Sequence, residues 1–149
     1  MAMLYLLDTD MVIYMLRGLK APARQQARRD KAQAIVQRCR DAQATGDTVG
    51  LSTITISELE YGASKSGNYE AEIAAVWKIL VPFDIFDYDG IRAPVHYGHI
   101  RYALEEAGAT IGAMDLLIAA HALALSATLV TNNLAHFQRV PGLAVTRWP

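Results

Sequence analysis

The chain has 149 residues, which is enough for one domain with a substantial core, and its formal net charge is −1. Hydrophobic residues make up 52% of the chain and charged residues 19%, so the composition excludes a disordered protein. Cys39 is the single cysteine, which excludes an internal disulfide and a cysteine-based zinc site.

The apolar stretches are unsuited to membrane insertion. Asp8 and Asp10 interrupt the first stretch, which also lacks the basic start of a signal peptide. The longest mostly apolar stretch, residues 114–125, is shorter than a membrane span and contains Asp115 and His121. We therefore expect a cytoplasmic protein without membrane attachment.

Short apolar runs alternate with longer helical segments along the chain. The runs predict strands at residues 4–7, 49–53, 83–86 and 128–131, with an edge strand at 143–145. Helical spacing and Gly or Pro stop signals predict helices at residues 10–17, 23–44, 55–63, 69–80, 90–107 and 112–126. Strands that alternate with helices form parallel sheets covered on both faces. The sequence thus predicts a single α/β domain over residues 1–149, with a central parallel sheet of four to five short strands.

Three acidic residues stand beside apolar sequence, at a strand end or in the first turn of a helix. Asp8 follows the first strand, Glu58 lies in "STITISELEYGA", and Asp115 lies in "TIGAMDLLIAAHA". In parallel α/β sheets, ligands bind outside the carboxyl ends of the strands. A cluster of three carboxylates would suit a hard divalent cation such as Mg²⁺, which prefers oxygen ligands.

Each acid also has a purely structural interpretation. Thr55 and Glu58 have the spacing of a capping box, in which both side chains bond to free amides at a helix start. Asp115 in a first helical turn would be stabilised by the helix dipole. Asp8 and Asp10 are both suitable N-cap residues. No single acid therefore identifies a catalytic site by itself.

The combination of motifs is more specific. "YLLDTDMVIYML", "LSTITISELEYGA", "TIGAMDLLIAAHALALSATLVTNN" and "HFQRVPGL" together resemble the PIN-domain ribonucleases, and in particular the VapC toxins of bacterial toxin–antitoxin systems. The resemblance implies a PIN-like fold and a Mg²⁺-dependent endoribonuclease, with Mn²⁺ as an alternative metal. It implies an acidic pocket of Asp8, Glu58 and Asp115, in which Asp8 and Asp115 hold the metal and Glu58 orients or deprotonates the attacking water.

The same resemblance implies partners. A VapB-type antitoxin would neutralise the chain, which would form a homodimer, and the pattern "IGxxD…VTNN…F.RVPGL" is similar to toxins that cut initiator tRNA. Many PIN domains carry a further acid after the fourth strand, where this chain has Asn133, with His136 nearby. The departure argues against a second tightly bound metal. Thr131 is either a partner of the acids or the end of a strand, and Asp10 is either a ligand or a neighbour of the ligands.

Positive charge is concentrated in one segment, residues 17–40. It contains Arg17, Lys20, Arg24, Arg28, Arg29, Lys31, Arg38 and Arg40, which are eight of the fourteen Lys and Arg residues. These side chains either contact RNA phosphates or form a solvated or antitoxin-binding surface. His121, in the most apolar helix, is expected to be a core residue.

Two other functions are compatible with part of the pattern. The Asp8 and Asp10 spacing occurs in phosphatases of the haloacid-dehalogenase type, but these enzymes need a later lysine and the chain has none after Lys78. A non-catalytic PIN-like module that binds RNA or a partner protein would not need all three acids. We therefore expect an enzyme.

Overall fold

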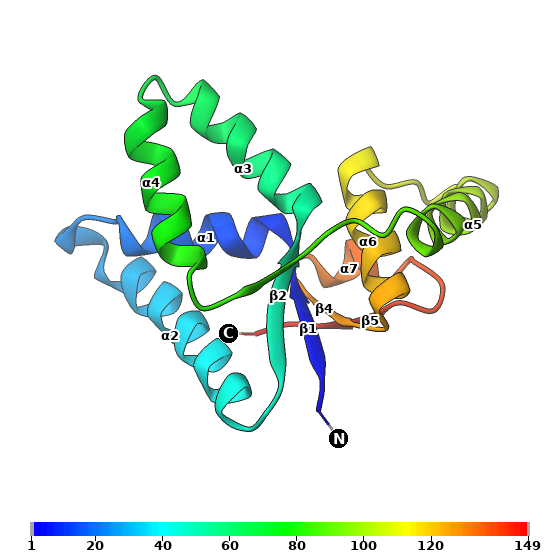
Figure 1. Ribbon diagram of the computed structural model, residues 1–149, viewed down its shortest axis with the longest axis horizontal. Coiled ribbons are helices and arrows are strands. Elements are labelled where there is room, and N and C mark those ends of the chain that lie inside the picture. Colours follow the sequence, from blue (N-terminus) through cyan, green and yellow to red (C-terminus); the bar gives the residue numbers. More distant parts are fainter. Residues whose placement is uncertain (1, 149) are drawn as a thin grey trace.

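Five short parallel strands form the centre of the computed structural model, which describes residues 2–148 (Figure 1). They are β1 (Leu4–Leu7), β2 (Thr48–Ser52), β3 (Asp84–Phe86), β4 (Thr128–Val130) and β5 (Ala144–Thr146). The strand order is β3-β2-β1-β4-β5, and all four pairings are parallel. The predicted fold class, an α/β domain with a central parallel sheet, is therefore confirmed.

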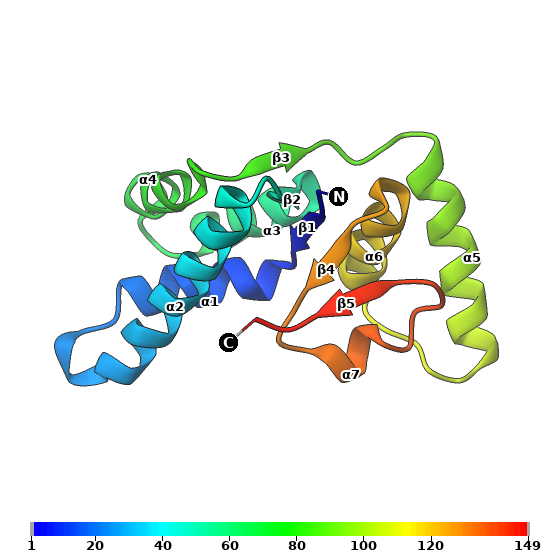
Figure 2. The same ribbon diagram turned by 90° about the horizontal axis from the view of Figure 1, so that it is seen from below.

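Helices join consecutive strands and cover both faces of the sheet (Figures 1 and 2). They are α1 (Thr9–Leu19), α2 (Gln26–Ala44), α3 (Thr53–Lys65), α4 (Tyr69–Leu80), α5 (Arg92–Glu106), α6 (Ala113–Leu125) and α7 (Leu134–Phe137). The helix predicted from residue 23 begins as a separate 3₁₀ turn, η1 (Ala23–Gln25), and α7 was not predicted. Within residues 2–148, no helix is both long and apolar enough to cross a membrane.

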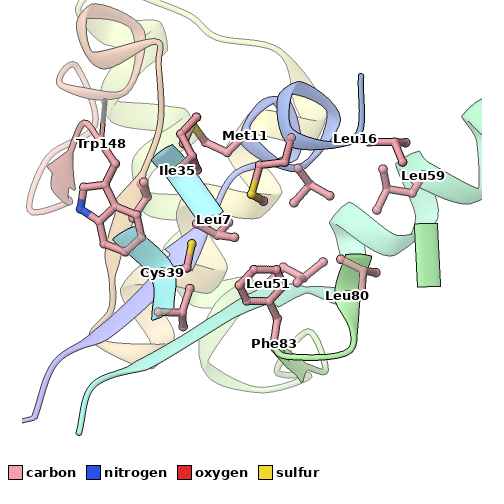
Figure 3. Packing of buried hydrophobic residues seen from close by; sticks show 14 of the residues in the cluster. Leu7, Met11, Leu16, Ile35, Cys39, Leu51, Leu59, Leu80, Phe83 and Trp148 are labelled. Atoms are coloured by element: carbon pink, nitrogen blue, oxygen red, sulfur yellow. The ribbon is translucent and has the colours of Figure 1, made fainter. Parts of the chain in front are cut away.

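Alternating side chains of the central strands divide the core in two. Leu7 points to the side of α1–α4, where it packs with Leu51, Met11 and Ile35 (Figure 3). Leu6, the adjacent residue, points to the opposite side and packs with residues of α5 and α6. Because successive side chains of a strand face opposite sides, a strand covered on both faces is apolar throughout. This explains why the run Leu4–Leu7 contains no polar side chain apart from the Tyr5 hydroxyl.

Candidate metal centre

Asp8 lies immediately after β1, at the carboxyl end of a central strand. Its side chain caps α1, since Oδ1 accepts a hydrogen bond from the Met11 amide at 2.8 Å. Oδ2 accepts a hydrogen bond of 2.5 Å from the Thr131 hydroxyl, and Thr131 is fully buried after β4. Asp8 itself is only 3% exposed. The sequence left open whether Asp8 is an N-cap or a residue of the acidic site. The structure shows that Asp8 caps α1 and lies in the acidic site as well.

Burial dominates the electrostatics of Asp8. Removal from water raises its pKa from the usual 3.8 to about 6, against the lowering effect of the Thr131 and Met11 hydrogen bonds. The negative charges of Asp10 and Asp115 raise it further. The fold thus places a carboxylate where its negative charge is poorly compensated by the protein.

Glu58 is half-buried and faces α1 from the first half of α3. Its Oε1 accepts a hydrogen bond from the Thr9 hydroxyl at 2.6 Å, and the Thr9 and Thr55 hydroxyl oxygens lie 2.9 Å apart. Since Thr9 donates its proton to Glu58, Thr55 donates to Thr9. Figure 1 shows α1 and α3 beginning close together at the carboxyl ends of β1 and β2, which brings these residues into contact.

The capping-box interpretation of Thr55 and Glu58 is wrong. The N-cap of α3 is Ser52, whose Oγ accepts a hydrogen bond from the Ile54 amide at 3.0 Å. Thr55 therefore lies inside the helix, where its side chain is buried and contacts Thr9. Glu58 is free of a capping role. Burial raises its pKa, with further raising effects from Asp115 and Asp10.

Asp115 occupies the first turn of α6, as expected, and it has a partner that the sequence analysis did not identify. The Nε2 atom of His136, in α7, lies 3.0 Å from Oδ2 of Asp115. Burial raises the pKa of Asp115, while the His136 hydrogen bond opposes the shift. The two residues are 21 positions apart in the chain, so no local spacing pattern could have revealed the contact.

Asp10 connects the three acids electrostatically. It is exposed in the first turn of α1, and its charge raises the pKa of Asp8, Glu58 and Asp115. Four carboxylates therefore share one region at the carboxyl end of the sheet. Within residues 2–148, however, no three His, Cys, Asp or Glu side chains stand close enough to bind one ion simultaneously.

This arrangement suits a hydrated hard cation better than a fully ligated one. Mg²⁺ usually retains several waters and takes one or two carboxylates directly. Buried Asp8, with its raised pKa, would gain most from a nearby positive charge. The remaining acids are placed to accept hydrogen bonds from metal-bound water, so the donor set fits a divalent cation.

The other residues singled out in the sequence have structural roles in this region. Thr131 accepts a hydrogen bond from the Asn133 amide at 2.9 Å, in addition to donating to Asp8. The side chain of Asn133 is exposed. His121 is fully buried, as predicted, and its Nδ1 shares a hydrogen bond of 2.7 Å with the Ser52 hydroxyl.

The chain matches a known protein family over most of its length. The PIN domain model matches residues 5–143. The chain is 34% identical over 146 residues to "Ribonuclease VapC2" of Rickettsia felis, covering 98% of both chains. It is 40% identical over 98 residues to "tRNA(fMet)-specific endonuclease VapC" of Salmonella typhimurium, covering 66% of this chain and 74% of that one. It also superposes on the crystal structure of VapBC2 from Rickettsia felis bound to a promoter DNA fragment, with a TM-score of 0.82 and 35% identity, covering 99% of this chain and 100% of that one.

Proposed function

Because the chain belongs to the PIN-domain family, we propose that it is a metal-dependent endoribonuclease that acts as the toxin of a toxin–antitoxin pair. The observation that carries the proposal is the buried carboxylate of Asp8 at the carboxyl end of β1, within electrostatic reach of Asp10 and Asp115. We propose Asp8, Glu58 and Asp115 as the catalytic residues of a single domain, with Asp8 and Asp115 as the metal ligands and Mg²⁺ as the physiological metal.

The chain's own residues would prepare the site for hydrolysis of a phosphodiester. The Met11 amide and the Thr131 hydroxyl fix both oxygens of Asp8, while His136 fixes one oxygen of Asp115. When bound, a divalent cation neutralises charge on the scissile phosphate and acidifies a coordinated water. Rigid carboxylates of this kind favour catalysis because they are already oriented before the substrate arrives.

Glu58 is the residue best suited to take a proton from the attacking water. Thr9 orients its carboxylate through the 2.6 Å hydrogen bond, and burial raises its pKa toward the range in which a carboxylate is an effective base. The water oxygen would bond to phosphorus and its proton would pass to Glu58, while the bond from phosphorus to the 3′-oxygen breaks. The 3′-oxygen then takes a proton from solvent, leaving a 5′-phosphate and a 3′-hydroxyl.

We propose tRNA as the substrate, because the similar Salmonella typhimurium protein is a tRNA(fMet)-specific endonuclease. A VapB-type antitoxin is the proposed partner, since the similar Rickettsia felis structure is a VapBC complex. A cavity of about 260 Å³ opens beside Glu58, with Ile13, Leu59 and Val76 in its lining, and would admit a segment of the antitoxin. We further propose a homodimer that acts in the cytoplasm.

Purified protein incubated with total tRNA tests the proposed activity. We expect discrete fragments with Mg²⁺, intact tRNA with EDTA, and intact tRNA with Asp115→Asn under both conditions. Asp84→Asn is the matched control, because Asp84 is exposed on the edge strand β3, two strands away from β1. Undiminished cleavage by Asp115→Asn, or cleavage in EDTA, would contradict the proposal; intact tRNA in every sample would favour a module that binds without cutting.

A further inference from the structure

The basic arm, which we define as residues 17–31, projects from the body of the protein. It comprises the end of α1, η1 and the start of α2, and it forms the outer tip of the α1–α2 hairpin in both views (Figures 1 and 2). The first buried residue of α2 is Ala32, so no side chain between Gln26 and Lys31 is buried. The arm therefore adds almost nothing to the core, and its sequence is free to serve another purpose.

Charge on the arm is almost entirely of one sign. It carries six of the fourteen Lys and Arg residues of the chain and one of the fifteen Asp and Glu residues, so its net charge is +5 and that of the remainder is −6. Lys20 pairs with Glu72 at 2.9 Å, whereas none of the other five has a carboxylate within 4 Å among the described residues. An ordinary solvated surface mixes both signs.

One face of α1 connects the acidic site to the basic arm. Asp10, Tyr14 and Arg17 follow the i, i+4, i+7 spacing of one face of α1, and Asp10 lies within electrostatic reach of all three proposed catalytic acids. Arg17 also lines the cavity that contains Glu58. This face of α1 therefore begins at the site and ends in positive charge.

The connection continues onto α2. Lys31 Nζ lies 5.9 Å from the centroid of the Tyr14 ring, which joins the face of α1 to the arm. Arg28 precedes Lys31 by three residues, the spacing of neighbours on one face of α2, and Arg24 lies in the 3₁₀ turn η1 that precedes this helix. At 1.5 Å per residue, the seven residues from Asp10 to Arg17 span about 10 Å along α1.

We propose that the basic arm binds the phosphate backbone of the RNA substrate on one side of the scissile bond. This inference rests on the proposed nuclease function. In the metal-free protein the four carboxylates at the site repel a polyanion, so attraction comes from elsewhere on the surface. The guanidinium groups of Arg24 and Arg28 match phosphate oxygens in a fork geometry.

The test measures RNA binding in EDTA, where the RNA stays intact, by fluorescence anisotropy with a labelled single-stranded 30-mer. The arm variant is Arg24→Gln, Arg28→Gln and Lys31→Gln. The control variant is Lys65→Gln, Lys78→Gln and Arg101→Gln, which has the same net charge and alters exposed residues of α3, α4 and α5. A second arm variant carries only Arg24→Gln and Arg28→Gln, so that Lys31 keeps its contact with Tyr14. Circular dichroism verifies that each variant is folded.

Each phosphate contact to a single strand contributes a slope of about 0.7 to the dependence of log affinity on log salt. Between 50 and 200 mM salt the parent should therefore lose roughly 15- to 20-fold more affinity than the triple arm variant, and the control variant should behave as the parent.

Equal affinity and equal salt dependence in the arm and control variants would overturn the inference. So would an arm variant that binds RNA normally but no longer binds the antitoxin, since the arm would then serve a protein partner. A parent that binds RNA through the arm but cuts none would contradict the nuclease function and leave the arm assignment standing. The two conclusions can therefore fail separately.

Discussion

Replacement of Asp8 by Asn should stabilise the metal-free protein at neutral pH while abolishing catalysis. The unfolded chain gives up the Asp8 proton near its usual pKa of 3.8, whereas the native chain gives it up at about 6. Above pH 3.8 the unfolded state therefore binds fewer protons than the native state, and the free energy of unfolding falls as the pH rises through this window. The penalty is complete above pH 6.

The raised pKa gives the magnitude. The difference between 3.8 and about 6 corresponds to about 3 kcal/mol of native-state penalty at pH 7. Asn retains the N-cap bond to the Met11 amide but replaces an acceptor of the Thr131 hydroxyl, which costs about 1 kcal/mol. The net gain is therefore about 1–2 kcal/mol, or roughly 2–8 °C in Tm for a domain of this size.

Thermal unfolding in EDTA, followed by circular dichroism from pH 4 to 7.5, measures the effect. Asp8→Asn should unfold at a higher temperature than the parent at pH 7, and the difference should disappear toward pH 4. Mg²⁺ should raise the Tm of the parent and leave the variant unchanged. The reasoning would be refuted by a variant that is less stable than the parent by the same amount at every pH. Asp84→Asn, at an exposed position, should show no such pH dependence.

Four further substitutions, in two pairs, test how the helices around the site are held. A Cβ on Gly18 would lie 2.4 Å from the Ala32 Cβ, so Gly18→Ala should lower the free energy of unfolding by about 1–3 kcal/mol in urea. Gly62→Ala, with open space around it in α3, should instead be neutral or stabilising. His121→Leu should cost about 1–3 kcal/mol by removing the partner of the Ser52 hydroxyl. Ser52→Ala also removes the N-cap of α3, so the loss in the double variant should be smaller than the sum of the two single losses; additive losses would show that the hydrogen bond contributes nothing.

Local sequence patterns predicted most of the fold because burial on both faces of the sheet leaves a strong signature. The strand at Leu4–Leu7 and the helix at Tyr69–Leu80 were predicted to the residue. The short helix α7 was missed, since its four residues, Leu134–Phe137, have too few turns for a periodic pattern. The start of α2 was placed three residues early, because a 3₁₀ turn has a composition similar to that of the helix that follows it.

The sequence was less informative about the site, because its geometry depends on contacts between distant segments. Glu58 and Thr55 have the spacing of a capping box, and only the position of Ser52 as N-cap shows that this interpretation is wrong. The contact of His136 with Asp115 depends on how α7 folds back toward α6. The roles of Asp8, Glu58 and Asp115 in catalysis remain predictions, supported by burial, hydrogen bonding and mutual repulsion.

The central claim is that Asp8 and Asp115 bind a divalent cation beside Glu58, and calorimetric titration of the protein with Mg²⁺ tests it most directly. At pH 6 about half of the Asp8 side chains are protonated, so Mg²⁺ binding should release about half a proton per ion. This release is measured as a change of the binding enthalpy with the ionisation enthalpy of the buffer. Asp8→Asn should release fewer protons and bind far more weakly, and Asp115→Asn should also bind weakly. Mg²⁺ binding of parental strength by both variants would contradict the account.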